Sequence, residues 1–202
     1  MAFAARFRFL AVVCLLVAGL VVTLPSASWA ALNAYLQLPD CTGTVTVAGL
    51  QGAIQLNGFT SKVANNTTPS GAAGVGRAVF SPIQVLKDLD KCSPHLFLDV
   101  VSGHTLQTVT ILFTRTSASG KEEPFFKITL THVTISSVET TTVAGNGTDD
   151  LRNIQSPTAP EVNTGNPTSV QEIVTLNYAQ IKLTELATNV TTTFDVAGNR
   201  LR

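Results

Sequence analysis

The chain has 202 residues, of which 13 are lysine or arginine and 13 are aspartate or glutamate. This balance gives no broad electrostatic field, which argues against nucleic acid or an anionic membrane surface as a partner. The length is sufficient for one domain with a substantial hydrophobic core.

The first thirty residues have the three-part pattern of a secretory signal peptide. Two arginines precede an almost unbroken apolar run at 9–22, and residues 28–30 read Ser-Trp-Ala, the small-x-small pattern that a signal peptidase cuts. The apolar run is shorter than the ~20 residues of a membrane-spanning helix. We therefore expect cleavage between Ala30 and Ala31, with an uncleaved anchor as the alternative. The mature chain, 31–202, would be one domain of formal charge −2, free of the membrane and located in the periplasm or outside the cell.

The mature chain keeps two cysteines, Cys41 and Cys92. An even number in an exported protein is compatible with one disulfide. Two separate buried thiols, or a bridge between subunits, are open alternatives because the sequence does not give the distance between the Cα atoms. We expect both cysteines to be oxidised, within one chain or between chains.

The first part of the mature chain offers two interpretations of Asn57-Gly58. This pair either marks a tight hairpin turn or is a bulge within one long strand over residues 53–63. Residues 65–76 follow and contain almost nothing to bury, so they are expected to form a loosely held loop.

Residues 93–103 carry the signals of one short helix. Ser93 suits the N-cap, a proline follows at the first helical position, and Gly103 suits the C-terminal end. The apolar spacing predicts one face that packs against the rest of the domain. This face consists of Leu96, Phe97, Val100 and Val101.

The remaining segments predict β-strands, because they are rich in Thr, Val, Ile and Phe. Val109, Ile111 and Phe113 share one face of a strand, opposite Thr108, Thr110 and Thr114.

Two later strands change phase. Apolar side chains fall on even positions over 126–130 and on odd positions over 133–135, and the same change separates 174–178 from 181–183. A strand of strict period two would lose its buried face at such a change. Bent strands of this kind suit a small closed or nearly closed barrel. We expect a bulge or sharp bend near Thr131-His132 and another near Ala179-Gln180.

Residues 140–168 have no sustained period and are rich in Gly, Asn, Asp, Thr and Pro. Nearly thirty residues without structure are unusual inside a compact domain. This segment is therefore expected to be an excursion from the barrel, disordered or ordered only by a neighbouring molecule.

No catalytic pattern stands out. The chain lacks a G-x-S-x-G elbow, a paired-histidine zinc spacing and a phosphate loop. Ser102-Gly103-His104 is interpreted as a helix end, and His95 and His132 as ordinary surface or capping residues. The sequence predicts no enzyme, no cofactor and no metal site.

The order of several segments is more informative than any one of them. They are NAYLQL at 33–38, IQL at 54–56, FSPIQVLKDLDKCSPHLFLDVVSG at 80–103, VTI at 109–111, FKITL at 126–130, EIVTLNYAQI at 172–181 and FDV at 194–196. Across essentially the whole mature chain, this order resembles the haemolysin-coregulated protein (Hcp) family, the tube protein of bacterial type VI secretion. The lysine, the aspartate and the Ser-Pro-x-Leu-Phe pieces within 80–103 are the most specific part of the resemblance.

The resemblance implies an Hcp-like β-barrel of two sheets with one short flanking α-helix. It also implies six copies that close head to tail into a ring, rings that stack into a hollow tube, and small effector proteins that ride in the lumen. In the family, the loop after the second strand reaches the neighbouring ring, and this loop corresponds to residues 63–77 here. Its candidate contact residues are Val63, Asn66, Pro69, Gly74 and Arg77.

The predicted signal peptide departs from the family, whose members generally lack one because the tube is assembled in the cytoplasm. We therefore expect an exported structural protein of the Hcp type that assembles with itself into rings and stacked tubes or fibres outside the cytoplasm. One alternative is an ordinary type VI tube and effector-carrier component whose leader is misassigned or unused. Another is a monomeric extracellular binding module on the same fold, displaying residues 140–168.

Overall fold

The computed structural model of the chain describes residues 31–65, 77–117, 120–144, 167–198 and 200–201. The predicted signal peptide, with Ala30, lies outside the described residues. Within the described ranges no helix is long and apolar enough to cross a membrane. One helix, α2 (Ser93–Ser102), accompanies the strands β1 (Leu32–Gln37), β2 (Ile54–Leu56), β3 (Gly58–Thr60), β4 (Val63–Asn65), β5 (Ala78–Phe80), β6 (Ile83–Asp88), β7 (Thr105–Thr116), β8 (Glu122–Ala144), β9 (Pro167–Glu185), β10 (Thr191–Asp195) and β11 (Arg200–Leu201).

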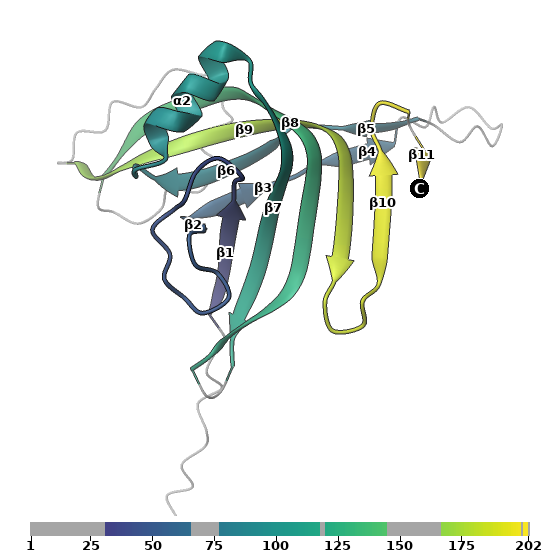
Figure 1. Cartoon of the computed structure of the whole chain (residues 1–202), viewed down its shortest axis with the longest axis horizontal. Coiled ribbons are helices and arrows are strands. Elements are labelled where there is room, and N and C mark those ends of the chain that lie inside the picture. Colours follow the sequence, from purple (N-terminus) through teal and green to yellow (C-terminus); the bar gives the residue numbers. More distant parts are fainter. Residues whose placement is uncertain (1–30, 66–76, 118–119, 145–166, 199, 202) are drawn as a thin grey trace, which may run out of the picture. The chain divides into compact units, whose positions relative to one another are not determined.

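Strand pairing runs around a closed circuit, which confirms the predicted barrel (Figure 1). From β1, the antiparallel pairs continue through β7, β8, β9, β6 and β3. β2, which immediately precedes β3, pairs with β1 and completes the circuit. Asn57 separates β2 from β3, and its backbone N–H donates to the Leu86 carbonyl at 2.7 Å. β2 and β3 are thus two parts of one bent strand, so the hairpin interpretation of Asn57-Gly58 is wrong.

The barrel interior is filled by apolar side chains from every strand of the circuit. Phe59 of β3 is partly buried against this core. Fully buried representatives from the other strands are Leu36, Leu56, Val85, Ile111, Leu130 and Leu176. A second, smaller cluster lies on the opposite face of β1, where Tyr35 packs with Leu50 and Ala53. Because neighbouring residues of a strand face opposite sides, the connection between β1 and β2 covers the outer face of this part of the barrel.

Gly43 lies where the two arms of this connection pair with each other. Its N–H donates to the Gly52 carbonyl at 2.6 Å. An added Cβ would collide with the Ala53 carbonyl and lie 2.8 Å from Ile54 Cγ1.

Replacing Gly43 with alanine is therefore expected to destabilise the domain by about 1–3 kcal/mol through overpacking. Urea unfolding of both proteins measures the difference. Thr44→Ala, at the exposed neighbouring position, is the control and should stay within about 0.5 kcal/mol of the wild type. Equal stability of the two variants would contradict the packing argument.

The predicted bend near Thr131-His132 is confirmed, and the change of phase predicted near Ala179-Gln180 is found between the buried Leu176 and Ile181 of β9. Leu130 and Val133 are both fully buried, and His132 between them has a φ of 50°. Pairing of β8 with β7 and with β9 skips His132 without a change of register. The change of buried parity also occurs in β7, between Leu106 and Val109, which the sequence analysis did not predict. Three adjacent strands therefore bend at the same level, and the register shift of β8 against β9 falls later, between Ile135 and Ser137.

The helix is confirmed, but two of its details are corrected. Cys92, not Ser93, occupies the N-cap position, and no side chain caps the helix start. Gly103 ends the helix in the left-handed conformation as predicted, with a φ of 66°. Phe97 and Val101 are 64% and 68% exposed, so their expected burial is wrong. The helix instead turns Leu96 and the polar Asp99 inward, and buried polar contacts determine that orientation.

The expected excursion at 140–168 is shorter than predicted at both ends. β8 continues to Ala144 and β9 begins at Pro167, with Thr140 opposite Glu172 in the ladder. The threonines at 140–142 are β-branched and suit an exposed strand, although they show no hydrophobic alternation. The rest of the segment, 145–166, lies outside the described residues.

Candidate functional site

A fully buried lysine holds the start of α2 against the barrel. Lys87 on β6 is 0% exposed, and its Nζ lies 2.6 Å from Oε2 of Glu172 on β9 and 3.0 Å from Oδ1 of Asp90. Lys87 Nζ also donates to Ser93 Oγ at 3.1 Å, and this hydroxyl donates to Glu172 Oε2 at 2.6 Å. A buried charge needs such partners to offset its desolvation. The network therefore joins β6, β9 and the first residue of the helix.

Cys41 and Cys92 form a disulfide, with their Cα atoms 5.9 Å apart. This is the usual Cα separation for such a bond. Cys92 is buried and directly precedes α2, whereas Cys41 lies in the connection from β1 to β2. The bond thus ties this connection to the same end of the helix that the Lys87 network holds.

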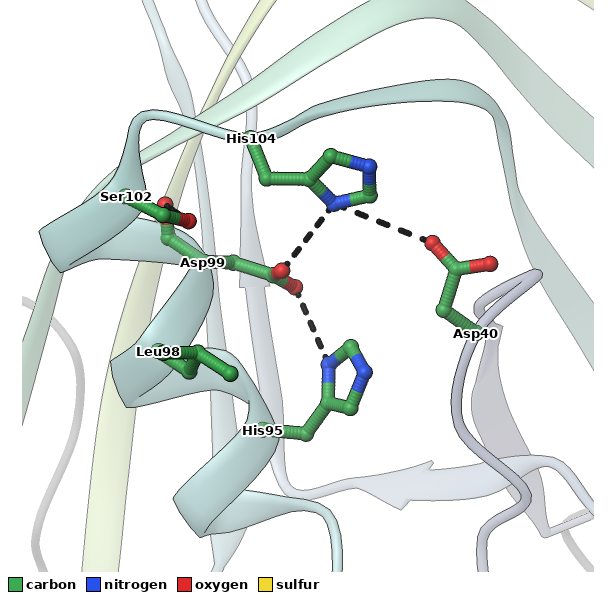
Figure 2. Close-up of a pocket in the computed structure, with 6 residues that line it drawn as sticks. All are labelled: Asp40, His95, Leu98, Asp99, Ser102 and His104. Carbon is green, nitrogen blue, oxygen red and sulfur yellow. Dashed lines mark hydrogen bonds and ion pairs between the residues drawn. The ribbon is translucent and has the colours of Figure 1, made fainter.

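A groove of about 480 Å³ lies beside α2, lined by Asp40, His95, Leu98, Asp99, Ser102 and His104 (Figure 2). The Asp99 side chain is only 4% exposed and lies between two imidazoles. Nδ1 of His95 is 3.3 Å from Oδ2 of Asp99, and Nδ1 of His104 is 3.1 Å from Oδ1. Asp40, on the connection that Cys41 anchors, reaches within 3.8 Å of the same His104 nitrogen.

The serine of the groove is not paired with either histidine. The Ser102 hydroxyl donates to the Asp99 backbone carbonyl at 3.5 Å, which is a helix-end contact. No hydrogen bond between this hydroxyl and an imidazole is found among the described residues, so the nucleophile–base pair that acyl transfer needs is missing there. The described ranges also contain no group of three or more His, Cys, Asp or Glu side chains that could hold a metal ion.

A second polar cluster is centred on Glu122, at the start of β8. Its carboxylate accepts hydrogen bonds from Asn33 Nδ2 at 3.0 Å, from the Tyr35 hydroxyl at 2.8 Å and from Thr114 Oγ1 at 2.9 Å. Thr114 is consequently fully buried, although strand alternation placed it on the outer face. Thr114 stays on that face, because it pairs with Asn33 of β1 and lies two residues from Leu112, which packs against the outer cluster around Tyr35. Burial, aided by the hydrogen bond to Glu122 and its negative charge, raises the pKa of Tyr35 to about 12.

This raised pKa predicts a loss of stability at alkaline pH. Tyr35 loses its proton near pH 10 in the unfolded chain and only near pH 12 in the folded one. The stability that Tyr35 contributes is therefore present below pH 10 and is lost as the pH rises to 12. Urea unfolding between pH 9 and about 12 should show a smaller loss for Tyr35→Phe than for the wild type.

Absorbance titration provides an independent check, since the chain has only two tyrosines. In a Tyr178→Phe variant, the remaining phenol should titrate well above the usual tyrosine range. Titration of Tyr35 near pH 10 would contradict the proposed environment.

The other predicted site residues are only partly described. Val63 is the first residue of β4 and Arg77 directly precedes β5, and both are exposed. Asn66, Pro69 and Gly74 lie outside the described residues, as does Ala30. Ala31 precedes β1, and its carbonyl accepts a hydrogen bond from the Thr116 N–H at 3.1 Å.

The sequence analysis did not connect Asp99 with the histidines. The spacing of four between His95 and Asp99 on a predicted helix was an available signal, because such residues lie on the same helix face. The Glu122 cluster gave no local signal, since 89 positions separate Glu122 from Asn33.

A protein-family model described as "Type VI secretion system effector, Hcp" matches residues 35–184. The "Major exported protein" of Pseudomonas aeruginosa is 31% identical over 91 residues, which cover 45% of this chain. The match includes 53% of that protein, so the chain spans about half the length of this curated relative.

Several solved structures share the fold. A "type six secretion system protein" has a TM-score of 0.66 at 19% identity, with 85% of this chain and all of the other covered (100%). Hcp1 of Salmonella typhimurium has a TM-score of 0.62 at 15% identity, with 85% and 99% covered. Hcp1 of the E. coli EAEC 042 pathovar has a TM-score of 0.62 at 20% identity, with 82% and 97% covered. At these identities the likeness is one of fold.

Proposed function

Because this chain belongs to the Hcp family of type VI secretion proteins, we propose that it is a structural subunit that assembles with copies of itself into rings, and through stacked rings into tubes or fibres. The observation that carries the proposal is the family match over residues 35–184, which spans the barrel circuit and α2. The lack of a nucleophile–base pair in the described groove favours a structural role over a catalytic one.

The physical properties of the described surface support self-association. Large apolar side chains remain exposed on β1, the β4–β5 ribbon and α2. A contact between two different patches of identical chains forms a ring when the rotation closes, and a filament when it does not.

Electron microscopy and sedimentation of the purified chain, starting at Ala31, test this function. Rings or filaments that form reversibly with concentration are the expected result. A strict monomer at high concentration would reject the assembly and leave the monomeric binding module as the better reading of the fold.

We further propose that assembly occurs outside the cytoplasm, after removal of residues 1–30. The support is the signal-peptide pattern in the sequence, together with the name of the Pseudomonas relative, which describes that protein as exported. Mass spectrometry of the N-terminus should find a chain that begins at Ala31. A chain that retains Met1 and stays in the cytoplasm would instead favour an ordinary type VI tube component, whose lumen carries effector proteins.

A further inference from the structure

The two cysteines of the disulfide differ in how open they are to other molecules. Cys92 is 0% exposed and belongs to the hydrophobic core. Cys41 is only partly buried, and its neighbours Asp40 and Thr42 are exposed. A second molecule can therefore approach Cys41, whereas Cys92 is covered by its own domain.

The backbone around the two cysteines differs in the same sense. The Cys92 N–H donates to Oδ1 of Asp90 at 2.9 Å, and the Cys92 carbonyl accepts from the Leu96 N–H at 3.0 Å. The following residue, Ser93, donates into the buried ion-pair network. Residues 39–42, by contrast, belong to no strand and make no backbone hydrogen bond with the part of the chain that the structure describes. Cys92 thus occupies a fixed position, and the link that carries Cys41 closes onto it.

The order of the cysteines along the chain also distinguishes them. Cys41 lies near the start of the proposed mature chain, and Cys92 follows 51 residues later. A chain that is exported from its N-terminus presents Cys41 while β2 to β6 and Cys92 have still to emerge. Residues 31–202 contain no further cysteine. Because disulfides form by exchange with an existing disulfide, that disulfide has to come from another molecule.

We propose that the exported chain is the substrate of a protein disulfide oxidase, with Cys41 as the attacking thiol and Cys92 as the resolving thiol. The inference rests on the proposed export and adds the class of partner that completes the fold. The partly buried Cys41 on its loosely held link makes the contact with the oxidase, and the fixed Cys92 ends it.

The exchange takes place in two steps. The Cys41 thiolate first attacks the disulfide of the oxidase, so that a bond forms between the two molecules and one oxidase sulfur leaves and takes up a proton. The Cys92 thiolate then attacks Sγ of Cys41, the bond within the chain forms, and the second oxidase sulfur leaves as a thiol. The electron pair and both protons lost by the two cysteines are thus gained by the oxidase.

Two single-cysteine variants of the full-length chain, recovered from the cells that export them, test the assignment. Cys92→Ala lacks the resolving thiol, so a mixed disulfide between Cys41 and the oxidase should accumulate above its level in the wild type. Cys41→Ala is the matched control, because it loses the same bond. Its mixed disulfide should be rarer, since folding covers the remaining thiol. Non-reducing electrophoresis and mass spectrometry of the trapped partner measure both.

The trapping result distinguishes this inference from the proposed function. Equal trapping of the two variants, preference for Cys92, or no trapped partner on either would overturn the assignment and leave the proposed self-assembly intact. A wild-type chain that stays in the cytoplasm with reduced thiols would overturn the assignment together with the proposed export. A strict monomer would reject self-assembly without affecting the assignment.

Reaction of the purified variants, starting at Ala31, with oxidised glutathione tests the difference in access directly. In the folded proteins Cys41 should form the adduct at least about tenfold faster than Cys92, because a buried thiol reacts only when the domain opens locally. In urea, where both variants are unfolded, the two rates should agree within about a factor of two. Mass spectrometry follows the adducts, and circular dichroism establishes which variants are folded. Equal rates in the folded variants would overturn the difference in access; if loss of the bond unfolds them, the trapping in cells decides.

Discussion

Replacing Glu172 with leucine should lower the free energy of unfolding by about 3–5 kcal/mol. The Lys87 ammonium is 0% exposed and lies 2.6 Å from the Glu172 carboxylate. Without that carboxylate, Asp90 is the ionic partner that the described residues leave to the buried charge, and the Ser93 hydroxyl loses its shorter hydrogen bond and keeps the 3.5 Å contact with Asp90. Thermal and urea unfolding measure the loss, which corresponds to a drop in Tm of roughly 10 °C at about 2–4 °C per kcal/mol.

A second variant separates the charge from the packing. The double variant Lys87→Met and Glu172→Leu removes both charges and keeps comparable volume, so it should regain most of the lost stability. Glu139→Leu changes an exposed acid on the neighbouring strand and should stay within about 0.5 kcal/mol of the wild type. A double variant no more stable than Glu172→Leu would show that the side-chain shapes, rather than the unpaired charge, carry the effect.

The bent strands show what periodicity can predict. Burial of alternate side chains is a local property, so the change of phase between Leu130 and Val133 was visible in the sequence and predicted a bend that closes the barrel. The third bend, in β7, was missed because the expected strand began only at Thr108. Leu106, on the other side of that bend, is buried with the opposite parity.

The orientation of α2 could not be obtained from its own residues. Leu96, Phe97, Val100 and Val101 formed a plausible apolar face, yet the helix buries Asp99 and exposes Phe97. The start of the helix is fixed by residues distant in sequence. Glu172 anchors Ser93, and Cys41 is bonded to Cys92. Long-range polar contacts overrode the amphipathic pattern, as buried charges that need partners commonly do.

The groove illustrates the same limit on site prediction. Its histidines were read as separate surface residues, because Asp40 and His104 are brought together only when the connection after β1 folds against α2. Cys41, the neighbour of Asp40, bonds this connection to Cys92 at the start of α2, so the disulfide also holds one wall of the groove in place.

Removal of the disulfide should lower the free energy of unfolding by about 4 kcal/mol. The bond closes a loop of 51 residues, and the loop entropy that it removes from the unfolded chain accounts for this value on the chain-entropy model. Cys41→Ser with Cys92→Ala is the suitable variant, since alanine avoids an unpaired hydroxyl at the buried Cys92 position. Urea unfolding of the variant, and of the wild type with and without a reductant, provides the measurement.

Removal of the disulfide should lower the stability of the whole domain but change the folded structure only in the connection after β1. The Lys87 network and Leu96 still hold the helix, whereas the connection after β1 loses its attachment at Cys41. Limited proteolysis of the folded variant should therefore begin within residues 38–53, before any cut in the barrel strands, because proteases act where local opening is cheapest. Gly43→Ala, which disturbs the same connection with the disulfide intact, is the comparison. A wild type with two free thiols by mass, or with the same unfolding midpoint before and after reduction, would reject the role of the bond.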